Sequence, residues 1–320
     1  MASTSGDKGF NTTKSFNYRF AKMIIDTFMF FNELDILEIR LRELWDVVDV
    51  FVLLECGEAL SGVQKPLIFE EHKQRFERFL PHIRHIKLRG LPPLVKDTEG
   101  NRFWLERFQR DALMLGLVGH GLQQDDLVLL SDVDEIPKAS AVREVSVSIT
   151  FDEVWLFKQK VYYRYFDHLP QRSPDLKWLG TVAVRYNAFS NILPHDLRRR
   201  WAKAGEYWTP AHEMDHTRRF VEDGGWHLTY FGSKAAYDYK TANFAHGANG
   251  GVGGTYGDPN TVAPATISRE ETVGIKPFDN GVRAFLMRYI QNDLSGEVPR
   301  TITTDLPMFY HLFESSKHKR

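Results

Sequence analysis

The chain has 320 residues, 42% of them hydrophobic and 13% aromatic, which is enough for one large domain or two small ones with a real core. Basic and acidic residues nearly balance at 41 and 42, which argues against the strongly basic surface of a nucleic-acid-binding protein. The single cysteine, Cys56, excludes an internal disulfide, so the chain does not look built for an oxidising compartment.

Residues 1–17 are polar and lack the apolar core of a signal peptide. No window approaches the roughly 20 apolar residues of a transmembrane segment. We therefore expect a soluble, cytoplasmic protein with a flexible tail at 1–17 and a single domain at 18–320.

Strands and helices alternate in the first half of the chain. We expect strands at 22–31, 47–55, 83–88 and from 127 onward, with helices at 34–45, 66–80 and 103–117 between them. Asn32 is the expected N-cap of the first helix. Trp104, Phe108, Ala112 and Leu115 lie near one face of the last helix. The alternation predicts an α/β fold with a mainly parallel, doubly wound sheet.

The second half is less regular. We expect strands at 154–166, 180–186 and 226–231, an irregular polar stretch at 191–220 and a helix at 233–244. The aromatic residues of 154–166 can stack on a sugar or base, but such residues more often belong to the core. Six glycines within 247–257 predict a mobile loop.

Three carboxylates follow the apolar strand that starts at residue 127. They are Asp132, Asp134 and Glu135, and Pro137 then ends the element. Acids at the end of a buried strand need a partner, and a divalent cation is the simplest one. In an extended chain Asp132 and Asp134 point to the same side, so both can face one ion. The alternative is a solvated turn with a helix-capping acid, because an Asp-x-Asp triplet alone is weak evidence.

A second constellation spans Glu222 to His227. Gly224 and Gly225 allow a tight turn and close backbone approach. Trp226 and His227 then point to opposite sides of a strand, so one can pack while the other faces a site. His227 is a candidate metal or phosphate ligand, and so is His246, although a lone histidine is more often a satisfied core residue.

The stretch from His212 to His216 has the histidine spacing of a zinc protease, but its flanks lack an apolar helical face, so we do not expect zinc hydrolysis. Taken in order, four other segments resemble glycosyltransferase family 17. They are residues 31–41, 45–49 and 132–137 and the run Gly225-Trp226-His227.

The resemblance implies a GT-A-type fold with a nucleotide-sugar-binding half at 18–140 and an acceptor-side half at 141–320. It also implies UDP-N-acetylglucosamine as donor, a glycan or glycoprotein as acceptor, and inversion at the anomeric carbon. Asp132, Asp134 and His227 would bind Mn²⁺ or Mg²⁺. The animal members are membrane-anchored Golgi proteins, so the Golgi is a possible location by analogy alone.

In the mechanism that we expect, the donor lies over the first strands. Its expected contacts are Phe31, Asn32, Glu33, Glu55, Asp132, Trp226 and His227. Direct displacement needs a carboxylate as general base, and the candidates are Asp223, Glu222 and Glu135. Glu135 has an alternative role, which is to hold the turn or to pair with Arg102 or Arg110. The loop at 247–257 is a candidate lid.

Two other classes of function stay open. A metal-dependent nucleotidyltransferase or nucleotide-sugar hydrolase would use the same acids without a sugar acceptor. A non-catalytic glycan-binding protein of the same fold would bind donor and metal weakly, and the intact pair of Asp132 and Asp134 speaks against it.

Overall fold

The structure is a computed structural model that describes most of the chain. The described residues are 22–93, 96, 98–166, 168–170, 177–202, 217–231, 234–245, 262–264 and 297–312. The expected tail at 1–17, the zinc-protease-like stretch at 212–216, His246 and the expected lid at 247–257 lie outside these residues.

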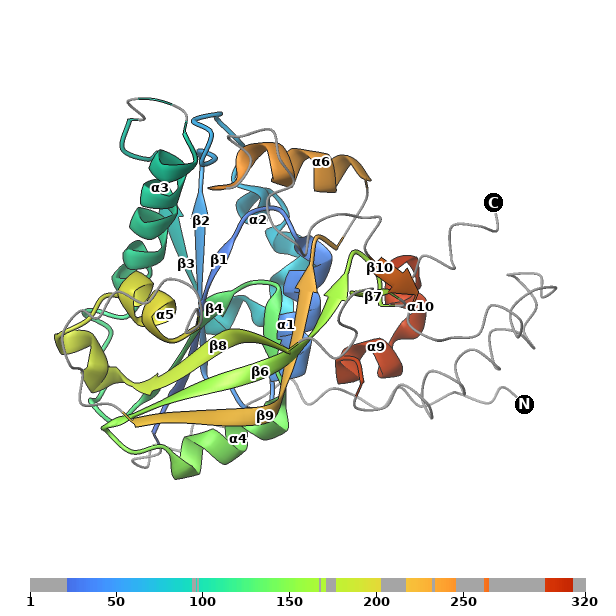
Figure 1. Cartoon of the computed structure of the whole chain (residues 1–320). Coiled ribbons are helices and arrows are strands. Elements are labelled where there is room, and N and C mark those ends of the chain that lie inside the picture. The colour runs from blue at the N-terminus through green and yellow to red at the C-terminus, as the bar shows by residue number, and fades with distance from the viewer. Residues whose placement is uncertain are drawn as a thin grey trace, which may run out of the picture.

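One mixed sheet of eight strands runs through the described part of the chain, in the order β3-β2-β1-β4-β8-β6-β9-β5 (Figure 1). The strands β3, β2, β1 and β4 are parallel neighbours, β8 is antiparallel to β4 and β6, and β9 is parallel to β6. The expected α/β fold is confirmed. The bounds are β1 Ile24–Phe30, β2 Val50–Cys56, β3 Ile83–Leu88, β4 Leu127–Asp132, β5 Glu135–Pro137, β6 Glu153–Tyr163, β8 Lys177–Arg185 and β9 Thr217–Thr229. A separate pair joins β7 His168–Pro170 to β10 Val262–Pro264.

Two apolar layers cover the faces of this sheet. On one face, α1 (Leu34–Leu44), α4 (Ala139–Ser148) and the 3₁₀ helix η1 (Lys73–His82) pack against Phe28, Phe51 and other buried residues. On the other face, the 3₁₀ helix η2 (Ala112–Gly116) and α5 (Pro194–Ala202) pack against the Val and Leu side chains of β4 and β8. Because both faces are buried, the parallel strands read as continuous apolar runs.

The remaining helices are short or lie at the edges. They are α2 Ile68–Glu71, α3 Glu99–Asp111, α6 Lys234–Asn243, α9 Arg300–Thr304 and α10 Leu306–Phe309, with 3₁₀ turns η3 Tyr186–Ser190 and η6 Tyr310–Leu312. Figure 1 shows α6 beyond the ends of β1 and β2, far in sequence from either strand. No helix among the described residues is both long enough and apolar enough to cross a bilayer.

Several sequence predictions need correction. The expected helix at 66–80 is split into α2 and η1, and the unexpected α5 lies within the stretch that we predicted to be irregular. The N-cap of α1 is Glu33, not Asn32. The apolar face noted at 103–117 does not face the core, because Trp104 and Leu115 are 54% and 58% exposed while Leu105 is buried.

The strand predicted at 226–231 is longer and starts at Thr217. Gly225, with φ of +137°, lets β9 approach β5 closely, since an added Cβ would lie 2.1 Å from the carbonyl oxygen of Ile136. The aromatic residues of 154–166 are mainly core, as expected: Phe157, Tyr162, Tyr163 and Phe166 are all buried.

Candidate active site

The acidic residues lie on a turn whose backbone carbonyls accept hydrogen bonds from Arg40 of α1. β4 ends at Asp132, and β5 begins at Glu135 after a two-residue turn. The Arg40 guanidinium is fully buried, and its Nη1 donates to the carbonyls of Asp132, Val133 and Glu135 at 3.0, 3.3 and 2.9 Å. Its other nitrogens bind the Asp26 carboxylate at 2.8 and 2.6 Å. The turn is therefore fixed by a buried, charge-assisted network.

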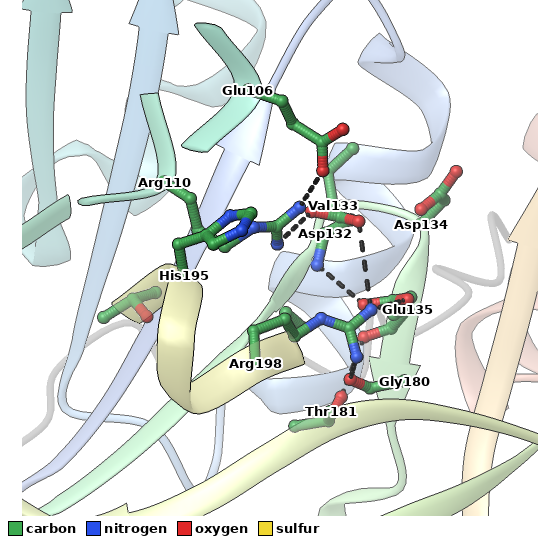
Figure 2. Close-up of polar contacts among 12 residues, drawn as sticks. Glu106, Arg110, Asp132, Val133, Asp134, Glu135, Gly180, Thr181, His195 and Arg198 are labelled. Carbon is green, nitrogen blue, oxygen red and sulfur yellow. Dashed lines mark hydrogen bonds and ion pairs between the residues drawn. The ribbon is translucent and has the colours of Figure 1, made fainter. Parts of the chain in front are cut away.

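Asp132 points toward two arginines (Figure 2). Its Oδ1 accepts a 2.8 Å hydrogen bond from Arg110 of α3, and its Oδ2 lies 3.9 Å from Arg198 of α5. Arg110 also binds Glu106 at 2.8 Å. Burial opposes ionisation of Asp132, but the charges of Arg110 and Arg198 outweigh it and hold the pKa of this carboxyl well below its usual range. Asp132 is therefore a carboxylate at any ordinary pH.

Asp134 points away from Arg110 (Figure 2). Its Oδ2 accepts a 3.1 Å hydrogen bond from Lys240 of α6, and its Oδ1 lies 3.9 Å from Nε2 of His227. Lys240 also lies 2.6 Å from the Glu33 carboxylate. Burial opposes the charged form of Lys240, yet Asp134 and Glu33 outweigh it and raise the pKa of the ammonium above its usual range.

The expectation that Asp132 and Asp134 face one ion assumed an extended chain, whereas Val133 and Asp134 form a turn. In this structure the two carboxylates bind different partners, Arg110 and Lys240, and their joint binding of one ion stays a prediction. The described residues include no cluster of three or more His, Cys, Asp or Glu side chains positioned to hold a metal. Any metal site built from these residues therefore depends on fewer protein ligands.

Asp134 and His227 suit such a reduced site. Mg²⁺-type ions in nucleotide sites use one or two carboxylates, with substrate phosphates and water completing the shell. Nε2 of His227 faces Asp134, and the His227 ring lies against Trp178 with centroids 5.1 Å apart. Nδ1 of His227 is buried with no hydrogen-bond partner among the described residues. Asp132, by contrast, is already paired with Arg110.

Glu135 holds the turn rather than facing a substrate. Its Oε2 accepts the Asp132 backbone N–H at 2.8 Å, and its Oε1 accepts from Trp178 Nε1 at 2.5 Å and from Arg198. The side chain is buried. The arginine partner differs from the two expected ones, because Arg102 donates to the carbonyls of Ala242 and Phe244 and Arg110 binds Asp132.

Asp223 and Glu222 lie apart from the turn. Their side chains are 81% and 76% exposed and pair with Lys138 and Lys158. Asp223 precedes His227 by four residues of β9, a separation on the order of 13 Å along an extended strand. The structure therefore does not bring either carboxylate to Asp134.

The Trp226-His227 pair divides as the strand pattern predicts. Trp226 is buried among Ile136, Tyr162 and their neighbours, and its Nε1 donates to the Glu297 carbonyl at 2.6 Å. His227 faces Asp134 instead. A donor contact for Trp226 gains no support, since its ring and its N–H are both engaged in the core.

The other expected donor contacts lie at the carboxyl ends of β1 and β2. Phe31 stacks on Tyr239 of α6 with centroids 5.6 Å apart and lies 5.3 Å below the Lys65 ammonium. Glu33 accepts the N–H groups of Phe31 and Asn32 at 3.2 and 2.9 Å. Phe31, Asn32 and Glu33 therefore lie beside α6 and its Lys240, which binds Glu33.

Glu55 lies deeper, at the end of β2. It is fully buried, with its oxygens 3.0 Å from the Phe69 N–H and 3.2 Å from His85 Nε2. Glu55 therefore fixes the end of β2 and the start of α2.

Sequence reasoning missed three of the four cations that organise this site, and it named Arg110 only as a possible partner of Glu135, whereas Arg110 binds Asp132. Arg40, Arg110, Arg198 and Lys240 come from four different helices and each binds an acid of the turn or its backbone. The requirement that buried acids need partners pointed to such residues in general, but nothing in the local pattern identified them.

A family model and curated relatives match this chain. The model is glycosyltransferase family 17, and it covers residues 12–195, more than half of the chain. The rat and human proteins named β-1,4-mannosyl-glycoprotein 4-β-N-acetylglucosaminyltransferase are each 29% identical, over 151 and 141 residues. Those alignments cover 45% and 42% of this chain but only 27% and 26% of the relatives' lengths.

Two solved structures are also similar to part of the chain. One is a mannosyltransferase from Pyrobaculum calidifontis in complex with GDP-Man and Mn²⁺, with 10% identity, coverage of 53% of this chain and 45% of that chain, and a TM-score of 0.32. The other is glucosyl-3-phosphoglycerate synthase from Mycobacterium tuberculosis, with 15% identity, 53% and 58% coverage and a TM-score of 0.29. The family match includes the acidic turn, Arg40 of α1 and Arg110 of α3, and ends before Arg198 of α5; on its extent the chain belongs to glycosyltransferase family 17.

Proposed function

We propose that this protein transfers N-acetylglucosamine from UDP-N-acetylglucosamine to a hydroxyl of a glycan acceptor, with inversion and direct displacement. The family membership and the activity named for the rat and human relatives support the reaction class. The single structural observation that carries the proposal is the pairing of Asp134 with His227 just beyond the end of β4. Open α/β sheets bind ligands at this edge.

Asp134 and His227 would bind Mn²⁺ or Mg²⁺ in this proposal. The metal ion would neutralise charge on the departing diphosphate. Arg40 keeps the turn in place through its three carbonyl contacts, so Asp134 is presented in one position. Such preorganisation is worth more than a carboxylate on a mobile loop, because no reorganisation is needed at the moment of reaction.

Phe31, Asn32 and Glu33 would form the nucleotide side of the site. Phe31 is already stacked on Tyr239, and the Lys65 ammonium lies over its ring, so this group would border the base rather than stack on it. Asp132 is 35% exposed at its side chain, so it can accept hydrogen bonds from the donor while Arg110 keeps it ionised. The proposal assigns no acid–base role to Glu135, because hydrogen bonds engage both of its carboxylate oxygens. It assigns none to Asp223 or Glu222 either, because they are exposed on β9 and pair with lysines away from Asp134.

The test is a screen of UDP-, GDP- and CMP-sugars with Mn²⁺, with and without a panel of glycan acceptors, that measures release of the nucleotide. The proposal predicts UDP release from UDP-N-acetylglucosamine that requires both metal and acceptor and is lost in Asp134→Ala. Equal release without acceptor would favour a nucleotide-sugar hydrolase. Absence of donor binding in the presence of metal would favour a non-catalytic protein of the same fold.

A further inference from the structure

Lys240 binds Asp134, the carboxylate to which the proposed function assigns the metal. Its ammonium lies 3.1 Å from Asp134 Oδ2 and 2.6 Å from Glu33 Oε1, and its side chain is only 19% exposed. The remaining oxygen of Asp134 faces His227. Asp134 thus binds Lys240 through Oδ2, and its Oδ1 faces His227, where the proposed metal ion would bind.

The helix that carries Lys240 is attached to the site by contacts on both sides of the lysine. Tyr239 stacks on Phe31, and Ser61 donates to Asn243 Oδ1 at 2.6 Å. Arg102 donates to the carbonyls of Ala242 and Phe244 at 2.8 and 3.0 Å. These contacts place Lys240 over the turn although it is 106 residues from Asp134 in the chain.

We infer that Lys240 is a stand-in cation that suppresses metal binding to the free enzyme and makes it dependent on the nucleotide donor. The inference rests on the proposed function, because it concerns the same metal and donor. It goes beyond that function by assigning Lys240 a role in the order and coupling of binding.

The physical reason is charge balance around Asp134. A divalent ion bound to Oδ1 would lie within a few ångströms of the ammonium on Oδ2, and the two positive charges would repel strongly in this partly buried site. A diphosphate brings negative charge that both cations can share. Donor binding therefore removes the repulsion, and metal and donor bind with positive coupling.

The experiment measures Mn²⁺ binding from the decrease of the free Mn²⁺ electron paramagnetic resonance signal, with and without UDP. The variant is Lys240→Met, which removes the charge and keeps most of the side chain's length. Lys158→Met is the matched control, because Lys158 also pairs with a carboxylate, that of Glu222, away from Asp134. UDP binds Mn²⁺ in solution to the same extent in every sample, so differences between variants come from the protein.

The inference predicts that Lys240→Met binds Mn²⁺ without UDP about tenfold more tightly than the wild type. The gain in Mn²⁺ affinity produced by UDP should shrink by a similar factor, while Lys158→Met behaves as the wild type. Unchanged or weaker Mn²⁺ binding by Lys240→Met without UDP would overturn the inference. If UDP and Mn²⁺ together fail to bind the wild type, the metal-assisted transferase itself is refuted, which is a distinct result.

Loss of Lys240 leaves Glu33 without its closest cation, so a second pair of variants guards against misfolding. Glu33→Gln alone and Glu33→Gln with Lys240→Met differ only in the lysine, and both remove the carboxylate that would be left unpaired. The double variant should bind Mn²⁺ alone about tenfold more tightly than Glu33→Gln. Equal affinities in this pair would overturn the inference.

Discussion

Replacing Arg40 by methionine should destabilise the protein more than any exposed arginine replacement. The Arg40 side chain is fully buried and binds Asp26, which is equally buried, through two hydrogen bonds. Three further hydrogen bonds reach the backbone of the acidic turn, and one reaches Ser131 Oγ at 2.5 Å. Methionine fills much of the space but leaves the Asp26 carboxylate and three carbonyl groups without this partner.

The expected loss is about 3–5 kcal/mol in the free energy of unfolding, because breaking a buried pair leaves an uncompensated charge. That is a large share of the roughly 5–15 kcal/mol that stabilises a typical domain. Urea unfolding followed by far-ultraviolet circular dichroism at pH 7 measures the loss. The control is Arg300→Met, because the Arg300–Asp46 pair is about half exposed on both sides and should contribute at most about 1 kcal/mol.

A second comparison isolates the cause. Asp26→Asn combined with Arg40→Met removes the stranded charge, so part of the lost stability should return. The reasoning is refuted if Arg40→Met costs no more than Arg300→Met, or if the double variant is less stable than Arg40→Met alone.

Two further predictions concern β9 and the C-terminal segment. Gly225→Ala should lower the free energy of unfolding by about 3 kcal/mol, since the added Cβ would clash with the Ile136 carbonyl. Gly100→Ala is the control, because a Cβ at Gly100 would meet open space. Equal urea midpoints for the two variants would contradict this prediction. His311 Nε2 lies 2.6 Å from Asp35, and this hydrogen bond raises the pKa of His311. The stability from this pair should be present below about pH 6.5 and lost as pH rises through the raised pKa. The difference in urea midpoint between the wild type and His311→Gln should therefore decrease from pH 6 to pH 9. A difference that stays constant over this range would show that the pair of His311 and Asp35 does not stabilise the protein.

Local pattern was sufficient for much of the sheet. The strand predicted at 83–88 has the observed bounds Ile83–Leu88. The strand expected from residue 127 begins there but ends at Asp132, and Pro137 ends a separate strand, β5. α5 was not predicted because its buried side chains include His195 and Arg198, which give no apolar stripe. The apolar residues Trp104 and Phe108 of α3 are exposed, because tertiary packing buries the face that carries Leu105 together with Arg102 and Arg110.

The acids of the candidate site were predictable from the sequence, whereas of its cations only Arg110 was named, and with a different acid as its partner. The acidic turn and His227 follow from strand patterns within a few residues. Their partners come from far along the chain: Arg110 is 22 residues from Asp132, Arg198 is 63 from Glu135 and Lys240 is 106 from Asp134. The separation of Asp132 from Asp134 was also beyond the sequence, because it depends on a turn that buried Arg40 stabilises.

The most direct test of the account is the affinity of UDP in the presence of Mn²⁺, measured by isothermal titration calorimetry for the wild type, Asp134→Asn and Asp132→Asn. In the proposed site Asp134 and His227 bind the metal, while Asp132 stays paired with Arg110. We therefore expect Asp134→Asn to weaken Mn²⁺-dependent UDP binding by about 100-fold, and Asp132→Asn to weaken it much less. Wild-type affinity in Asp134→Asn, or a larger loss in Asp132→Asn, would contradict the central claim.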